Sequence, residues 1–172
     1  MAEPHDARIE RMEREFSEAM ARFMARVEAA GPAGDRAPAD GEWSAAQIAW
    51  HVGAVNRAFA GLITGMIDGA RPALPGFVER EWRSVLGQVP AKLTAAEPFQ
   101  PPPGVRMEDT LPKLRKSEGL VRDAIRSITP ERGSGFTFTS PVVGEISIYQ
   151  VGDWATAHVI RHNAQAKRVL AS

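Results

Sequence analysis

Apolar residues recur every three or four positions in two stretches of the N-terminal half, which is the spacing of an amphipathic helix. The first stretch extends from Asp6 to Ala30. The second follows Ser44, whose hydroxyl is suited to accept the free backbone donors of a first turn, and ends near Gly69. We expect one long helix in each. The apolar positions are Ile9, Met12, Phe16, Met20, Phe23 and Val27 in the first stretch, and Ile48, Val52, Val55, Phe59, Leu62, Ile63 and Met66 in the second.

A third apolar stripe in the C-terminal half predicts a third helix that begins near Leu111. We place Pro112 in its first turn, where the missing backbone donor of proline costs little. Thr129 and Pro130 are expected to close it.

The fourth predicted helix begins with Ser147, three residues before Gln150, which is the spacing of a capping box, and it continues through Val169. The preceding segment, residues 131–145, carries two glycines and an alternation of Phe and Thr. We expect an extended loop or a short strand there, too short to build a sheet.

The segments between the predicted helices are rich in Gly and Pro. Residues 31–41 form a connecting loop, and residues 69–107 are irregular, with a short helical piece expected over Phe77–Leu86. Four helices with one long crossover between the second and the third predict an all-α four-helix bundle. A chain of 172 residues favours a single domain, residues 1–172.

The composition narrows the function classes. Lys plus Arg (21) balance Asp plus Glu (21), so no strong field attracts nucleic acid or an anionic membrane. The absence of cysteine excludes disulfides, thiolate metal sites and a cysteine nucleophile. The N-terminal region lacks the apolar core of a signal peptide, and no stretch approaches the roughly 20 apolar residues of a membrane span. We therefore expect a cytoplasmic location.

Three of the four histidines fall on or beside the apolar stripes. His158 and His162 are separated by one helical turn, and His51 flanks the stripe of the second predicted helix. Two imidazoles at this spacing, with a third from a neighbouring helix, can hold one divalent metal and leave positions open to water. The alternative is that the histidines are hydrogen-bonded core residues, because a short HxxxH pair also occurs by chance. Val159 stands where the zincin motif needs glutamate, so that mechanism is excluded.

Two segments carry a resemblance to a known family. Residues 43–52 (WSAAQIAWHV) resemble the tryptophan-to-histidine segment that opens the second helix of DinB-like (YfiT-like) metal-binding bundle proteins. Residues 158–165 (HVIRHNAQ) resemble the HxxxHxxQ segment of their last helix, and residues 141–147 resemble its lead-in. The resemblance implies a DinB/YfiT-like bundle with His51, His158 and His162 as a metal triad, usually described with nickel or zinc, and a homodimer.

The chain departs from the family in two places. Many members have a further histidine where Arg161 stands, and residues 69–107 match nothing recognisable. The family name refers to induction by DNA damage and implies no DNA contact.

Two polar residues near the histidines are candidate supports of the site. Gln165 lies close to His162 and Asn56 follows His51 by five residues, so either could hydrogen-bond within the site. His5 is expected to be exposed and unrelated to it. Two sets are assigned to packing: Trp43, Trp50, Trp82 and Trp154 as anchors, and Gly61, Gly65 and Gly69 as a close helix or dimer contact.

Two functions follow from these predictions. One is a metal-dependent enzyme, either a hydrolase or a transferase that activates the sulfur of a low-molecular-weight thiol for a small-molecule substrate. The other is a non-catalytic dimer that binds metal or ligand, which the absence of an obvious acid or base favours. A metal-free structural bundle is the third possibility. Neither a nucleic acid nor a membrane is expected as a partner.

Overall fold

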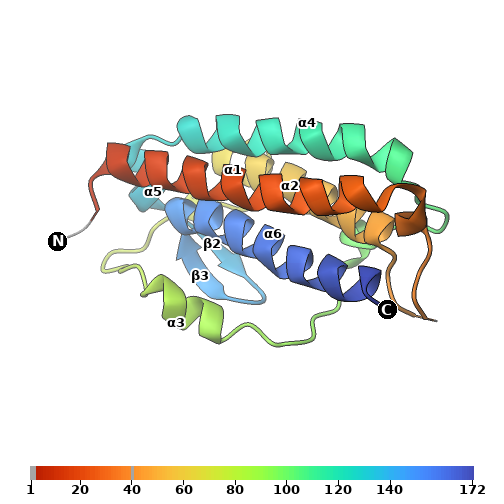
Figure 1. The fold of residues 1–172 in the computed structure, drawn as a ribbon. Helices are drawn as coiled ribbons and strands as arrows, with labels where there is room; N and C mark the ends of the chain where they lie inside the picture. Colours follow the sequence, from red (N-terminus) through yellow and green to blue (C-terminus); the bar gives the residue numbers. More distant parts are fainter. Residues whose placement is uncertain (1–2, 40) are drawn as a thin grey trace.

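A computed structural model describes residues 3–39 and 41–172. Its four long helices lie side by side as a bundle (Figure 1), in which α2 packs against α4 and α6, and α1 packs against α6 and α4. Their bounds are α1 His5–Ala30, α2 Ala45–Thr64, α4 Met107–Arg126 and α6 Ile148–Leu170. The predicted mainly helical fold is confirmed.

Two of the helices begin with the same local structure. The hydroxyl of Ser44 accepts from the backbone of Gln47, whose side chain accepts in return from the backbone of Ser44. Ser147 and Gln150 repeat this arrangement at the start of α6. Each capping box satisfies two backbone donors that a helix start otherwise leaves free. Both helices that carry the histidines therefore start at a defined residue.

The end of α2 corrects the sequence prediction. The helix ends at Thr64 rather than near Gly69, because Gly65 adopts a left-handed conformation with φ of 81°. The side chain of Arg132 donates to the carbonyl oxygens of Leu62 and Ile63 and so caps this end.

The start of α4 also differs from the prediction. Because this helix begins at Met107, Pro112 lies inside it rather than in its first turn. Asp35, at the end of a 3-10 turn (η1, Gly31–Asp35) in the predicted loop, accepts a hydrogen bond from the Met107 amide. That bond supplies a partner for a backbone donor that the helix leaves free, and it allows the earlier start.

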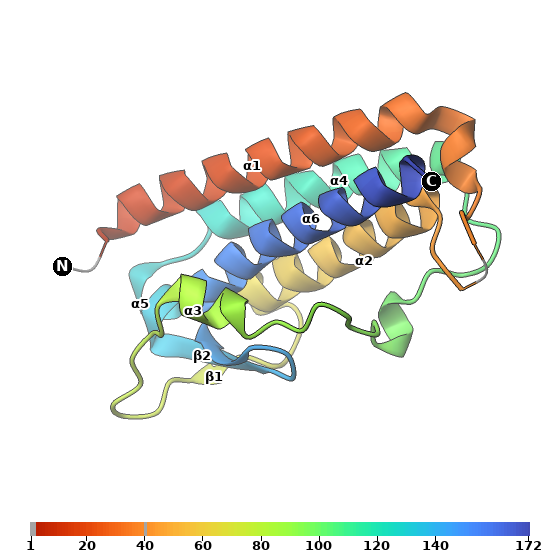
Figure 2. The same ribbon diagram turned by 60° about the horizontal axis from the view of Figure 1, so that its bottom comes forward.

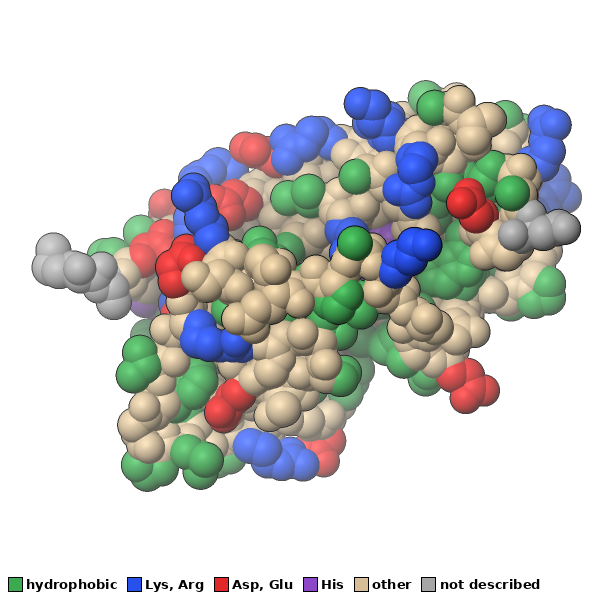
Figure 3. Space-filling model, turned by 90° about the horizontal axis from the view of Figure 1, so that it is seen from below, with side chains coloured by type: hydrophobic (Ala, Val, Ile, Leu, Met, Phe, Trp, Pro, Cys, Tyr) green, Lys and Arg blue, Asp and Glu red, His purple; other side chains and the backbone are tan. Residues whose placement is uncertain are grey.

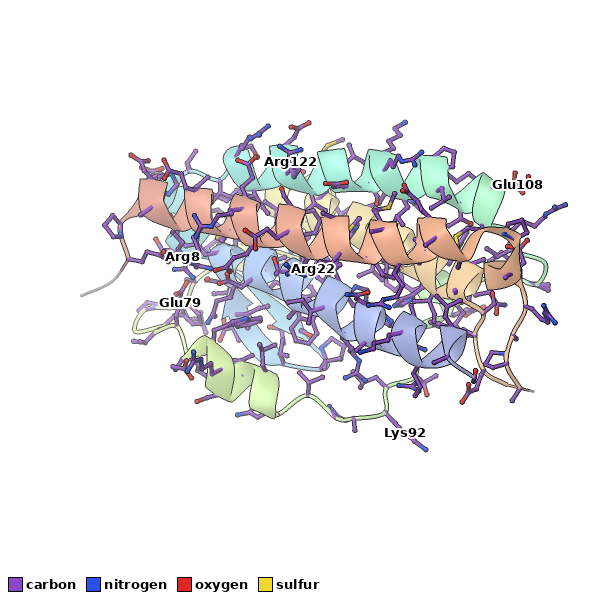
Figure 4. All side chains as sticks on the ribbon, viewed as in Figure 1. Arg8, Arg22, Glu79, Lys92, Glu108 and Arg122 are labelled. Carbon is purple, nitrogen blue, oxygen red and sulfur yellow. The ribbon has the colours of Figure 1, made fainter. Side chains whose placement is uncertain are left out.

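The crossover between α2 and α4 runs along the bundle beside α6 (Figure 2). It contains the short helix α3 (Trp82–Gly87) and a 3-10 turn, η2 (Glu97–Phe99), so the helical piece expected over Phe77–Leu86 begins five residues later. Glu79 pairs with Arg8 of α1 at 2.9 Å, at one end of the bundle (Figure 4).

The segment before α6 builds a sheet, and the expectation that it would not was wrong. Strands β2 (Phe136–Ser140) and β3 (Gly144–Ser147) form an antiparallel hairpin. A two-residue strand of the crossover, β1 (Arg71–Pro72), pairs antiparallel with β2 to complete three strands. The third predicted helix, α4, ends at Arg126, before Thr129 and Pro130, and the short helix α5 (Pro130–Gly135) begins at that proline.

One apolar core fills the space between the four long helices. Its largest fully buried side chains come from all four of them, and they include Phe16, Phe23, Ile48, Leu114 and Ile148. Within the described part of the chain, every helix is too short or too polar to cross a lipid bilayer.

Candidate metal centre

The predicted histidines come together between α2 and α6. His51 lies in the second turn of α2, and His158 and His162 lie one turn apart in the middle of α6. Each of the three rings offers a nitrogen, and the three nitrogens lie within 4.8 Å of one another. His51 and His162 are buried, whereas His158 is partly exposed.

The spacing of one pair of these nitrogens fits a shared ion. The Nε2 atoms of His51 and His158 are 3.1 Å apart. Two imidazole nitrogens bound to one zinc ion at about 2.0–2.1 Å, with an angle of about 90–110° between them, are separated by about 2.9–3.4 Å. The observed separation falls in this range.

Hydrogen bonds on the far side of two rings fix which nitrogen is free. His51 donates from Nδ1 to the carbonyl oxygen of Phe99 at 2.7 Å. His162 donates from Nδ1 to the side-chain oxygen of Gln165 at 2.7 Å. A neutral imidazole that donates from one nitrogen carries a lone pair on the other, so both Nε2 atoms are set up as ligands.

The ring of His158 completes the set without such a partner. Its Nδ1 is buried and makes no hydrogen bond to any described residue. Without an ion, the contact between His51 and His158 requires a proton on one of their two Nε2 atoms. If His158 carries that proton, its own buried Nδ1 is an acceptor without a donor. With an ion, both Nε2 lone pairs are used. The donor set therefore fits a divalent metal, although Nδ1–H of His158 still lacks an acceptor.

Burial keeps the rings neutral. The pKa of His162 falls to about 3, first because burial disfavours the imidazolium and then because of the neighbouring His51. Burial also lowers the pKa of His51 and carries that of His158 well below its ordinary value. Neutral imidazole is the form that binds metal, so protons compete weakly at these rings.

Aromatic side chains lie against two rings of the triad. The ring of Trp43 lies 5.0 Å from His51, and that of Phe59 lies 5.9 Å from His158, in both cases between centroids. Trp82 of α3 meets Trp154 of α6 edge to face at 6.1 Å, which fixes the crossover against the helix that carries two of the histidines.

Of the two residues expected to support the site, the structure brings one to it. Gln165 contacts His162, as described above. The amide of Asn56 is instead directed at Ser117 and at the sulfur of Met20, in the bundle core. His5 is not the isolated exposed residue expected from the sequence, because its Nδ1 lies 2.6 Å from the hydroxyl of Tyr149.

The triad is separate from a surface hollow beside Trp50. That hollow has a volume of about 160 Å³ and lies between residues 102–106 and the first turns of α4. None of the three histidines lines it, so it adds nothing to the candidate metal centre.

Sequence reasoning missed Phe99. Its contribution is a backbone carbonyl in the irregular crossover, which no side-chain motif marks. The adjoining run of prolines signalled a break in helical structure, but not the approach of this segment to His51.

Comparison with known proteins supports the resemblance seen in the sequence. No curated protein and no solved structure matches this chain. The family model of the DinB superfamily matches residues 9–166, a span that includes α2, α4, most of α1 and α6, and the three histidines. The chain therefore belongs to the DinB superfamily.

Proposed function

We propose that this protein is a metal-dependent enzyme that binds nickel or zinc through His51, His158 and His162. The observation that carries the proposal is the convergence of the three ring nitrogens within 4.8 Å, with the two buried rings held in the ligating tautomer. Core histidines without a metal role need no common point of convergence.

Three histidine ligands would leave at least one coordination position of the ion open. Three protein ligands are the number found in catalytic zinc sites, where a further position takes water or substrate. The triad contains no carboxylate, so the protein leaves the double charge of the ion uncompensated. An ion held in this way lowers the pKa of a water or a thiol bound to it.

The reaction class is suggested by the partners of the triad. Among the described residues, its hydrogen-bonding and aromatic partners are an amide, a backbone carbonyl and aromatic rings, and none of these is a general base. A nucleophile acidified by the ion itself needs no such base. We therefore favour transfer of the sulfur of a low-molecular-weight thiol to an electrophilic carbon, with hydrolysis as the second candidate.

In the transfer reaction, a carbon–sulfur bond forms and the bond from that carbon to its leaving group breaks, while the thiol proton passes to solvent. The residues of the chain hold the ion and exclude water from the buried sides of His51 and His162. A non-catalytic metal-binding protein remains the alternative function, and a homodimer remains a prediction for sedimentation measurements.

The test is turnover with a small thiol and an electrophilic aryl halide, and separately with an activated ester, for protein reconstituted with nickel or zinc. We expect thiol transfer that His158→Gln abolishes and His5→Gln, which removes a histidine outside the triad, preserves. Metal-loaded protein that turns over neither substrate faster than free metal would favour the non-catalytic alternative.

A further inference from the structure

Arg161 lies between the two histidines of α6 in sequence. It follows His158 by three residues, a spacing that makes the two side chains neighbours on the helix surface, and it directly precedes His162. Its side chain is half-buried, and its Nη2 donates to the carbonyl oxygen of Ala91 in the crossover at 2.8 Å. The hydrogen bond ties the guanidinium to the crossover, and the i, i+3 spacing places Arg161 next to His158, the one partly exposed histidine of the triad.

The charge of Arg161 is not neutralised by an acidic neighbour. Its hydrogen bond goes to a backbone carbonyl, and across residues 3–39 and 41–172 it forms no ion pair with a carboxylate. Other arginines that reach across the bundle differ in this respect, since Arg8 and Arg11 both pair with Asp153. The half-buried guanidinium of Arg161 therefore has N–H donors that can bind an anionic ligand.

Basic side chains lie near the exposed histidine surface. In Figure 3, a small area of histidine surface is visible near the centre of the face, with Lys and Arg side chains around it. The triad itself consists of neutral rings. An ion bound there would add its double charge to that of Arg161, with nothing negative from the triad to offset either.

We propose that Arg161 is a specificity-determining residue that selects a small carboxylate-bearing molecule as the ligand of the metal centre. The guanidinium offers parallel N–H donors that match a carboxylate, while the ion attracts the same negative charge. A neutral molecule of equal size gains neither interaction. This inference rests on the proposed function, because it presupposes an ion on the triad.

The experiment uses protein loaded with Co²⁺, whose visible absorption changes when a ligand binds. Acetate serves as the anionic probe and imidazole as the neutral one. The variants are Arg161→Gln and Arg161→Lys, with Arg168→Gln as the matched control, because Arg168 is an exposed arginine two turns along the same helix. Metal content and thermal unfolding are measured for each variant.

We expect Arg161→Gln to weaken acetate binding about tenfold or more while imidazole binding stays within about twofold. Arg161→Lys should recover part of the loss, and Arg168→Gln should leave both probes unchanged. A merely structural role, in which Arg161 only holds the crossover, would change both probes alike and would overturn the inference.

The two proposals fail in distinguishable ways. Wild-type protein that takes up no Co²⁺ would overturn the proposed function and this inference together. Full Co²⁺ content in every variant, with acetate binding unaffected by Arg161→Gln, would overturn only the role of Arg161.

Discussion

His51 donates a hydrogen bond of 2.7 Å to the carbonyl oxygen of Phe99, although the two residues are 48 positions apart in the chain. This bond joins a candidate metal ligand on α2 to the turn η2 in the crossover. Because Phe99 contributes only backbone, the orientation of the ring depends on the path of the crossover rather than on the identity of a side chain. The crossover is therefore part of the candidate metal centre.

Metal binding should consequently stabilise η2. An ion on Nε2 of His51 requires the proton on Nδ1 and strengthens it as a donor to Phe99. We expect the backbone amides of Phe99 and Gln100, which close this turn, to exchange with solvent more slowly after metal is added. Hydrogen exchange followed by mass spectrometry measures this, and unchanged exchange in fully loaded protein would contradict the coupling.

Gln165 should tune metal affinity through His162. The variant Gln165→Ala removes the acceptor that orients the ring, and loss of such a partner typically weakens metal binding about 10–100-fold. Competition with a chelator measures the affinity. Gln88→Ala, at an exposed glutamine on the crossover, is the control and should have no effect. Equal affinities for the two variants would show that the hydrogen bond does not support the site.

The stability of the metal-free protein should fall as the solution becomes acidic. The pKa of His162 is about 3 in the folded protein and about 6.5 when unfolded. Above pH 6.5 neither state takes up the proton. Between these values only the unfolded state does, so the free energy of unfolding falls by up to about 1.4 kcal/mol per pH unit for this ring.

Urea unfolding in chelator between pH 7 and pH 5 tests this dependence. We expect His162→Gln, which removes the titrating group, to lose stability less steeply than wild type over that range. If the free energy of unfolding depends on pH equally in wild type and in the variant, burial does not keep the His162 ring neutral.

Two glycines should respond in opposite ways to the same change. A Cβ at Gly133 would lie 2.2 Å from the ring of Tyr149, whereas one at Gly119 in α4 meets nothing within 4 Å. We expect Gly133→Ala to destabilise by about 1–3 kcal/mol and Gly119→Ala to stabilise by about 0.5–1 kcal/mol, because alanine favours helix. Free energies of unfolding at pH 7 decide this, and a stable Gly133→Ala variant would contradict the close contact.

The helices, and the placement of His158 and His162 on one side of α6, could be predicted because they depend on local periodicity, whereas the convergence of His51 with them was expected from the family resemblance. The apolar stripes of α1 and α6 and the serine caps at Ser44 and Ser147 are properties of neighbouring residues. The one-turn spacing of His158 and His162 likewise places both rings on one side of α6. The structure confirms each of these features.

The sheet and the Phe99 contact could not be predicted, because both depend on partners far away in the chain. Strand β1 consists of only two residues, both exposed and one of them proline. It is a strand only because it pairs with β2. The early start of α4 similarly depends on Asp35, which lies 72 positions before Met107. In each case the structure depends on a contact between residues far apart in the chain, and a periodic pattern of neighbouring residues does not predict such a contact.

The most direct test of the metal centre is elemental analysis of protein purified without a histidine tag and reconstituted with nickel or zinc. We expect about one equivalent per chain in wild type and in His5→Gln, and little in His51→Gln or His162→Gln, which each lose one of three ligands. Wild-type protein without metal, or triad variants that retain it, would contradict the assignment of His51, His158 and His162 as ligands.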